Sequence, residues 1–232
     1  TKMVFWKRKE KEIIYYLNRS KIETAGCISA MISINNPREG LLVDEIDSVI
    51  NSGSSNFAAS FYNFEEDSSI LFTSARINSK KDNPGDYLFC EIYESQKSNE
   101  KWSKPKSLGS PINTFVHEGT PAVSTNRQNL YFTRWSGTKE NGVREIYMSK
   151  YFNGQWLQPM KLNENVNMPG YHSMQPALLA EENVLFFASN RPEGYGKTDI
   201  WYCVMDEFGS AGVAENLGPL INTSEDDVSP YY

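Results

Sequence analysis

Short apolar runs separated by polar, glycine-containing turns recur along most of the chain. The longer runs are ILFTSAR from Ile70, LYFTRWSG from Leu130 and LFFASNR from Leu185. Each is followed by a shorter run, which is EIY at Glu91, EIY at Glu145 or DIW at Asp199. The runs are rich in aromatic and β-branched residues, and little of the chain follows the 3.6-residue period of an amphipathic helix. The pattern therefore predicts β-strands joined by turns.

The runs belong to units that repeat in phase. Residues of one type recur at intervals of 54 or 55 positions: Ile92, Ile146 and Ile200; Trp102 and Trp156; Asn113, Asn167 and Asn222; Pro121, Pro176 and Pro230. Each unit contains four segments of strand character, and four strands in a unit of about 55 residues are typical of a β-propeller blade. The sequence predicts an all-β fold, a β-propeller of four-stranded antiparallel blades.

The predicted propeller is a single domain over residues 1–232. Complete blades are predicted at 53–114, 115–168 and 169–223, and a further blade at 1–52 together with 224–232. If the last strand completes the N-terminal blade, the ring closes with four blades. If the sequence is part of a larger protein, which its start without Met suggests, the ring has more.

The N-terminal unit is the least regular. Lys2–Trp6 and Glu12–Tyr16 resemble the second and third strands of the other units. The interval from Ile13 to Asn51 is longer than its counterparts, which predicts an additional loop around Cys27.

Composition and charge narrow the functional classes. The chain has 232 residues, of which 39% are hydrophobic, and its 23 basic and 29 acidic residues give a net charge of -6. This length and composition predict a folded protein with a substantial core. The sequence lacks the clustered basic residues that a nucleic-acid-binding protein needs, so no nucleic acid is expected as partner. No apolar stretch approaches the roughly 18 residues of a transmembrane helix, so no membrane span is predicted.

The cysteines do not form a recognisable site. Cys27, Cys90 and Cys203 are far apart in the sequence and odd in number, and none belongs to a CxxC pair. No zinc or redox site is predicted, and no cofactor. Cys90 and Cys203 flank predicted strands and are interpreted as small buried side chains.

The third unit resembles a known repeat. The sequence SNRPEGYGKTDIWY followed by NLGPLINTSEDDVSP resembles the WD40-like (PD40) propeller repeat, which is similar to the repeats of TolB and of bacterial envelope proteins that join tetratricopeptide repeats to an OmpA-like domain. The resemblance covers residues 51–232. It implies a periplasmic or outer-membrane-associated protein of a Gram-negative envelope, with envelope proteins or peptidoglycan-associated proteins as partners. The middle unit departs from the pattern with TRW in place of SNR, and the last lacks the tryptophan and proline of the fourth strand.

Arginines and acidic residues recur in every unit. Arg76, Arg134 and Arg191 follow the second strands, and Glu91, Glu145 and Asp199 begin the third strands. Across an antiparallel hairpin they are expected to form structural pairs, Arg76 with Glu91, Arg134 with Glu145 and Arg191 with Asp199. An acid–base role is disfavoured, because a catalytic pair is needed once rather than in each blade.

Two histidines share one phase of the repeat. His117 and His172 each precede a periodic proline by four residues, and Asp226 takes that place in the last unit. Together with Glu118 and Asp227 they are candidates for a ring at the channel mouth that binds a cation or a polar partner. The alternative is that they are turn residues entering a strand.

The glycine-rich turn PEGYGKTD invites comparison with a phosphate-binding loop. It lies between two strands and opens no helix, so it is interpreted as a tight turn in which Gly194 and Gly196 supply positive φ angles.

No catalytic residue and no metal ligand is predicted. The nucleophile elbow G-x-S-x-G is absent, and the acidic pairs are adjacent, so on a strand their side chains would point to opposite faces. The leading hypothesis is a noncatalytic interaction module of the cell envelope that binds a protein through the aromatic loop residues Trp135, Tyr171 and Tyr195 or the channel mouth. The alternatives are a propeller glycosidase, the gating propeller of a peptidase, and a glycan- or peptidoglycan-binding module.

Overall fold

The structure is a computed structural model of residues 1–232. The residues that it describes are 20–21, 24, 27–28, 31–32, 35, 46–52, 55–62, 69–76, 89–124, 127–136, 142–179 and 183–231. The chain divides into two compact units, Thr1–Glu45 and Ile46–Tyr232.

In the first unit the described residues between Ser20 and Asn35 are helical. Ile28 precedes Met31 by three residues and Ile32 by four, spacings that place the three side chains on one face of a helix. The loop predicted around Cys27 is therefore wrong for these residues. The strands predicted at Lys2–Trp6 and Glu12–Tyr16 lie outside the described residues.

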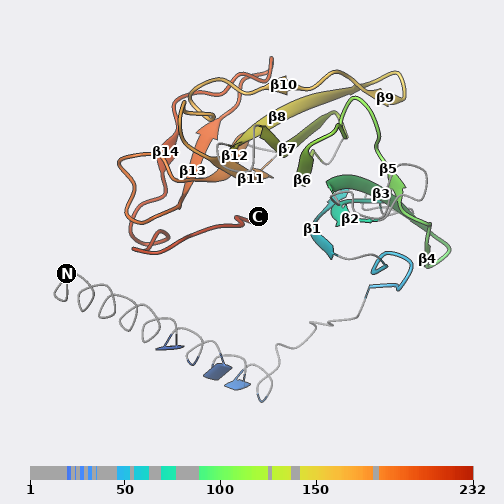
Figure 1. The fold of residues 1–232 in the computed structure, drawn as a ribbon, viewed down its shortest axis with the longest axis horizontal. Coiled ribbons are helices and arrows are strands. Elements are labelled where there is room, and N and C mark those ends of the chain that lie inside the picture. Colours follow the sequence, from blue (N-terminus) through green and yellow to red (C-terminus); the bar gives the residue numbers. More distant parts are fainter. Residues whose placement is uncertain are drawn as a thin grey trace, which may run out of the picture. The chain divides into compact units, whose positions relative to one another are not determined.

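The second unit contains three antiparallel sheets (Figure 1). The first sheet consists of β1 (Ser55–Tyr62), β2 (Ser69–Ala75), β3 (Cys90–Ser98), β4 (Lys101–Trp102) and β5 (Lys106–Ser107). The second consists of β6 (His117–Val123), β7 (Asn129–Ser136), β8 (Val143–Phe152), β9 (Gln155–Trp156) and β10 (Met160–Lys161). The third consists of β11 (Ser173–Leu179), β12 (Val184–Ser189), β13 (Asp199–Val204) and β14 (Glu215–Asn216). Each sheet lies within one of the repeat units.

The register of the central hairpins is the same in all three sheets. Ile92 pairs with Thr73, Ile146 with Thr133 and Ile200 with Ala188. Side chains alternate between the two faces along a strand, so equal register places equivalent residues on the corresponding face of each sheet.

The core lies between neighbouring sheets. Ile92 and Ile112 of the first repeat unit pack with Leu130 and Phe132 of the second, and all four are fully buried. A corresponding cluster joins the second repeat unit to Phe187 and its neighbours in the third repeat unit. Sheets packed face to face, with β1, β6 and β11 toward a common centre, make the unit Ile46–Tyr232 all-β and propeller-like (Figure 1). The prediction of a four-blade ring stays a prediction.

Candidate functional site

A hollow of about 570 Å³ lies where the first strands of the three sheets meet. Its wall comes from β1, β6, β11 and the C-terminal segment Ser229–Tyr231. A volume of this size is in the range of small-molecule sites. The hollow is concave, lies at the centre of the three sheets and is taken as the candidate site.

Four equivalent residues with positive φ angles surround the hollow. They are Ala58 (φ 51°), Thr120 (50°), Gln175 (55°) and Ser229 (58°). In β1, β6 and β11 each marks a bulge in the pairing with the next strand. A left-handed backbone conformation costs a non-glycine residue about 1–2 kcal/mol. Its recurrence at four equivalent positions indicates a regular feature of the fold and not a local irregularity.

Hydrogen bonds between repeat units hold these bulges. The backbone N–H of Thr120 donates to Oγ1 of Thr73 at 2.7 Å, and that of Gln175 donates to Oγ1 of Thr133 at 2.9 Å. In the third sheet the equivalent residue is Ala188, which has no hydroxyl. Oε1 of Gln175 accepts the N–H of Ser229 at 2.9 Å instead. The C-terminal segment is thereby placed as a fourth wall of the hollow.

The lining combines apolar surface with neutral polar groups. Phe57 and Phe61 contribute aromatic rings, the periodic prolines contribute apolar ring faces, and no described lining residue is charged. Nε2 of Gln175 has no hydrogen-bond partner among the described residues. The hollow therefore offers an amide donor beside apolar faces to an uncharged ligand.

His117 and His172 lie at junctions between repeat units. Nδ1 of His117 accepts the N–H of Cys90 at 3.1 Å, and Nδ1 of His172 accepts the N–H of Arg144 at 3.1 Å. Partial burial lowers the pKa of both histidines, and the nearby positive charge of Arg144 lowers that of His172 further. Each neutral imidazole thus accepts a bond from the preceding unit, which agrees with the alternative of residues entering a strand.

Asp226 takes the corresponding place at the last junction. Its backbone forms a parallel bridge with Thr198, at the start of the third strand, and the N–H of Asp227 donates to the Thr198 carbonyl at 2.7 Å. No group of three or more His, Cys, Asp and Glu side chains capable of holding a metal ion occurs among the described residues.

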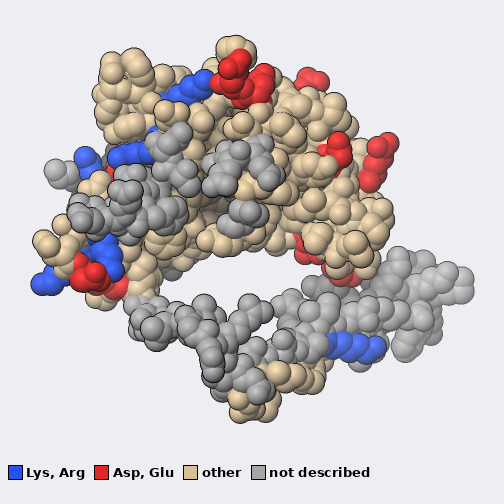
Figure 2. Space-filling view, turned by 180° about the vertical axis from the view of Figure 1, so that it is seen from behind, with Lys and Arg blue, Asp and Glu red and all other residues tan. Residues whose placement is uncertain are grey.

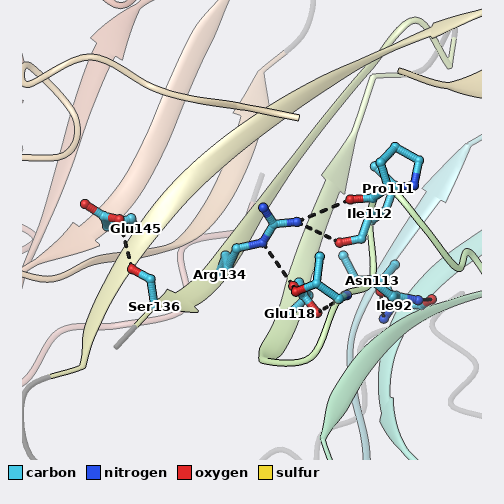
Figure 3. Close-up of polar contacts among 9 residues, drawn as sticks. Ile92, Pro111, Ile112, Asn113, Glu118, Arg134, Ser136 and Glu145 are labelled. Atoms are coloured by element: carbon cyan, nitrogen blue, oxygen red, sulfur yellow. Dashed lines mark hydrogen bonds and ion pairs between the residues drawn. The ribbon is translucent and has the colours of Figure 1, made fainter. Parts of the chain in front are cut away.

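The predicted pairs of arginine with third-strand carboxylates are wrong. Nε of Arg134 donates to Glu118 at 3.0 Å, and Nη2 donates to the carbonyl of Ile112 at 2.9 Å (Figure 3). Glu145 instead accepts hydrogen bonds from Ser136 and Lys161. The guanidinium also stacks on Tyr147, 4.6 Å from the ring centroid.

Arg76 and Arg191 follow the same arrangement, donating to the carbonyls of Ile50 and Val166. The carboxylates have other partners: Glu91 accepts from Ser107, and Asp199 accepts from its own loop. The arginines therefore connect a sheet to the preceding unit by donating to its carbonyls. Aromatic rings of the arginine's own sheet lie against each guanidinium.

Glu118 is fully buried beneath Arg134. Both the N–H and the hydroxyl of Thr114 donate to its carboxylate, at 3.0 and 2.5 Å. Burial raises the pKa of Glu118, while the bonds from Thr114 and the charge of Arg134 lower it. Asp227 is held in the same way by Thr223. By accepting from Thr114 and Thr223, the carboxylates of Glu118 and Asp227 fix the backbone that leads into a first strand.

The predicted aromatic anchors differ in exposure. Trp135 is partly buried against His117, with ring centroids 5.8 Å apart, and Arg144 lies over it at 4.7 Å. Tyr171 is also partly buried, whereas Tyr195 is 54% exposed. Only Tyr195 matches the expectation of an exposed loop aromatic.

The loop around Tyr195 binds its own carboxylate. The N–H groups of Tyr195 and Gly196 donate to Asp199 at 2.5 and 2.9 Å. The predicted positive φ angles at Gly194 and Gly196 are wrong, since neither has one. Glycine is required by close approach instead, because a Cβ at Gly196 would lie 2.4 Å from the Glu225 carbonyl oxygen.

No protein-family model and no curated protein matches the chain. Similar solved structures include an alpha-L-arabinofuranosidase from Lactobacillus brevis, at 14% identity and a TM-score of 0.46, where the match covers 69% of this chain and 54% of the other. A puromycin-hydrolysing peptidase from Mycobacterium tuberculosis matches at 13% identity and 0.42, over 71% and 23%. A Trypanosoma rangeli sialidase in complex with sialic acid matches at 11% and 0.34, over 71% and 38%.

These three proteins are enzymes, and this finding overturns the expectation that the chain is not one. The recurrence of arginine and acidic residues in every blade disfavours catalysis only for residues inside the repeat, and the absence of G-x-S-x-G and of separated acidic pairs concerns only those two types of site. The chain spans about half the length of the arabinofuranosidase and less of the other two.

Charge is distributed in small groups over the described surface. On the face shown in Figure 2, most described basic side chains of the second unit lie toward the left, and most acidic ones lie at the top and the right. This face has no continuous basic band. No helical stretch among the described residues has the length and apolar character that a membrane crossing requires.

The residues that build the hollow were missed in the sequence. Thr120, Gln175 and Ser229 each stand directly before a periodic proline, and this position was the available signal. The proline marked the phase of the repeat, but the positive φ angle of the residue before it appears only in the structure.

Proposed function

We propose that the chain is a β-propeller domain that binds a short, uncharged sugar chain in its central hollow. The observation that carries the proposal is the lining: aromatic and proline faces beside the amide of Gln175, without a described charge. Aromatic rings pack against the C–H faces of sugars, and amide and hydroxyl groups exchange hydrogen bonds with sugar hydroxyls.

Filling the hollow tests the proposal. Ala59 lines it and is exposed, so Ala59→Trp places an indole in the ligand space. Val213 is 76% exposed and does not line the hollow, which makes Val213→Trp the matched control. Binding found on an array of neutral glycans is measured by calorimetry on the wild type and both variants. We expect Ala59→Trp alone to lose binding; equal binding by both variants, or no neutral glycan bound by the wild type, would overturn the proposal.

A glycosidase is the second candidate, because the space that holds a sugar is also the path that a substrate would take. Incubating the bound glycans with the protein and following the release of reducing ends separates the two. Turnover that disappears in Ala59→Trp would favour the glycosidase. The cell-envelope location and the protein partners implied by the repeat resemblance stay predictions.

A further inference from the structure

The side chain of Gln175 is held at the wall of the hollow by a bond to its oxygen. Oε1 accepts the backbone N–H of Ser229 at 2.9 Å, and both residues line the hollow. Because the oxygen of the amide is bound, the nitrogen is its remaining polar end, with two N–H donors. This nitrogen, Nε2, has no hydrogen-bond partner among the described residues.

Neither the bulge nor the bond to Ser229 requires an amide at this position. The equivalent bulge residues are Ala58, Thr120 and Ser229, and none of them carries an amide side chain. The bond to Ser229 uses only the side-chain oxygen, which a carboxylate would supply equally well. The architecture of the fold therefore gives no role to the donor end of Gln175.

The backbone around the hollow has few donors left for a ligand. The N–H groups of Thr120 and Gln175 donate to threonine hydroxyls of the preceding repeat unit. The N–H of Val123 donates to Oγ of Ser60 at 3.1 Å. Three of the four bulge residues are followed by a proline, which has no N–H: Pro121, Pro176 and Pro230.

Among the described side chains that line the hollow, only that of Gln175 has a group that donates and cannot accept. The hydroxyls of the lining can do both, so they adapt to either kind of ligand group; they belong to Ser60, Thr120, Ser229 and Tyr231. A donor that loses its water without gaining an acceptor weakens binding. A ligand of the hollow is therefore selected for an acceptor that faces Nε2.

A carbonyl oxygen beside a small apolar group suits these surroundings. Phe57 and Phe61, which are 45% and 39% exposed, supply apolar surface in the same hollow, as do the prolines. Sugar hydroxyls both donate and accept, whereas the carbonyl of an acetamido group only accepts and its methyl group is apolar. Among uncharged sugars, those with an acetamido group combine the two properties.

We propose that Gln175 determines the specificity of the hollow and selects sugars that carry an acetamido group, whose carbonyl oxygen accepts a hydrogen bond from Nε2. This inference rests on the neutral-sugar binding proposed above and narrows its ligand class. The apolar lining takes the methyl group, and the adaptable hydroxyls of the lining accept the acetamido N–H.

Matched pairs of neutral glycans test the selection on the wild type. Tri-N-acetylchitotriose and cellotriose have the same linkage and carry either an acetamido group or a hydroxyl on each ring. N-acetyllactosamine and lactose differ in the same way at a single ring. The whole protein is titrated with each glycan by calorimetry. We expect the acetamido member of a bound pair to bind at least about tenfold more tightly, because its counterpart leaves Nε2 without a carbonyl.

Gln175→Glu separates the donor from the bond to Ser229. The carboxylate can still accept the Ser229 N–H, but it places an acceptor where Nε2 was. Gln155→Glu makes the same charge change at an exposed residue of β9 outside the hollow and is the matched control. We expect Gln175→Glu to lose at least about tenfold in affinity for the acetamido glycan and little for its counterpart, while Gln155→Glu keeps the wild-type preference. If Gln175→Glu does not fold, the comparison of the pairs on the wild type still decides.

Equal binding of both members of each pair would overturn the selection and leave the neutral-sugar proposal standing. An equal loss of both members in Gln175→Glu, or an unchanged preference, would do the same. If the array of neutral glycans instead yields only ligands without an acetamido group, the selection is likewise overturned. A wild type that binds no neutral glycan at all would overturn both proposals.

Discussion

The side chain of Asn167 forms two hydrogen bonds with the backbone of Ile146. Its Oδ1 accepts the Ile146 N–H at 2.8 Å, and its Nδ2 donates to the Ile146 carbonyl at 2.9 Å. The amide thus acts as the neighbouring strand would at the edge of the hairpin. Asn113 and Asn222 make the same pairs with Ile92 and Ile200.

Asn167→Ala should lower the free energy of unfolding by about 1–3 kcal/mol, because it leaves the buried N–H of Ile146 without a partner. The Ile146 carbonyl keeps a bond from the Leu162 N–H, while the Leu162 carbonyl loses the bond that Nδ2 of Asn167 donates at 3.0 Å. Asn165→Ala is the matched control, since Asn165 is exposed and donates a single bond to the Ala211 carbonyl. Urea unfolding measures both; similar midpoints for the two variants would contradict the assigned role.

Arg134→Met should lower the free energy of unfolding by about 3–5 kcal/mol, because it leaves the carboxylate of Glu118 buried without its cation. The side chain of Glu118 is 0% exposed and that of Arg134 is 12% exposed. Adding Glu118→Gln to Arg134→Met should restore part of the loss, since the uncompensated charge is removed.

Lys161→Met provides the comparison for an exposed ion pair. Lys161 binds Glu145 at 3.1 Å but its side chain is 52% exposed, so we expect about 0–1 kcal/mol. Denaturant unfolding of the four proteins tests the ranking. A double variant less stable than Arg134→Met would show that Glu118 is not the source of the loss.

The repeat period predicted the sheets but not the partners of their polar residues. Ile92, Ile146 and Ile200 mark equal positions in three third strands, as their spacing required. The arginine partners were predicted wrongly because cross-strand neighbours were considered and the preceding unit was not. Arg134 and Glu145 do face each other in the register, yet the arginine turns toward Ile112.

The hollow could not be predicted from the sequence, for a different reason. Its geometry depends on the backbone of Thr120, Gln175 and Ser229, and residues of these types adopt positive φ only when tertiary contacts require it. At the last junction the side chain of Gln175 accepts the backbone hydrogen bond that the Thr133 hydroxyl accepts at the junction before it. No local sequence pattern relates the residues that these bonds join.

Cys203 should resist alkylation in the folded protein. It is 1% exposed, and burial raises the pKa of its thiol to about 11, so little thiolate forms at neutral pH. Cys27 is exposed and should react first. Peptide mapping after a brief iodoacetamide pulse, with and without denaturant, measures both. Equal labelling of the two cysteines in the native protein would contradict the burial of Cys203.

Stability should fall as the pH decreases below about 6.5. The pKa of His117 and of His172 is lowered from 6.5 in the folded protein, mainly by burial. The unfolded chain therefore takes up these protons first, and protonation weakens folding between pH 6.5 and the lower folded values. Protonation of Nδ1 also removes the acceptor for the N–H groups of Cys90 and Arg144.

The double variant His117→Asn/His172→Asn isolates this effect, because the Asn Oδ1 can accept in place of Nδ1 without titrating. Its free energy of unfolding should change less than that of the wild type between pH 7.5 and 5.5. The raised pKa of Glu118 acts in the opposite direction but is common to both proteins, so it cancels in the difference. Parallel pH profiles in urea unfolding would show that the histidines do not link folding to protons.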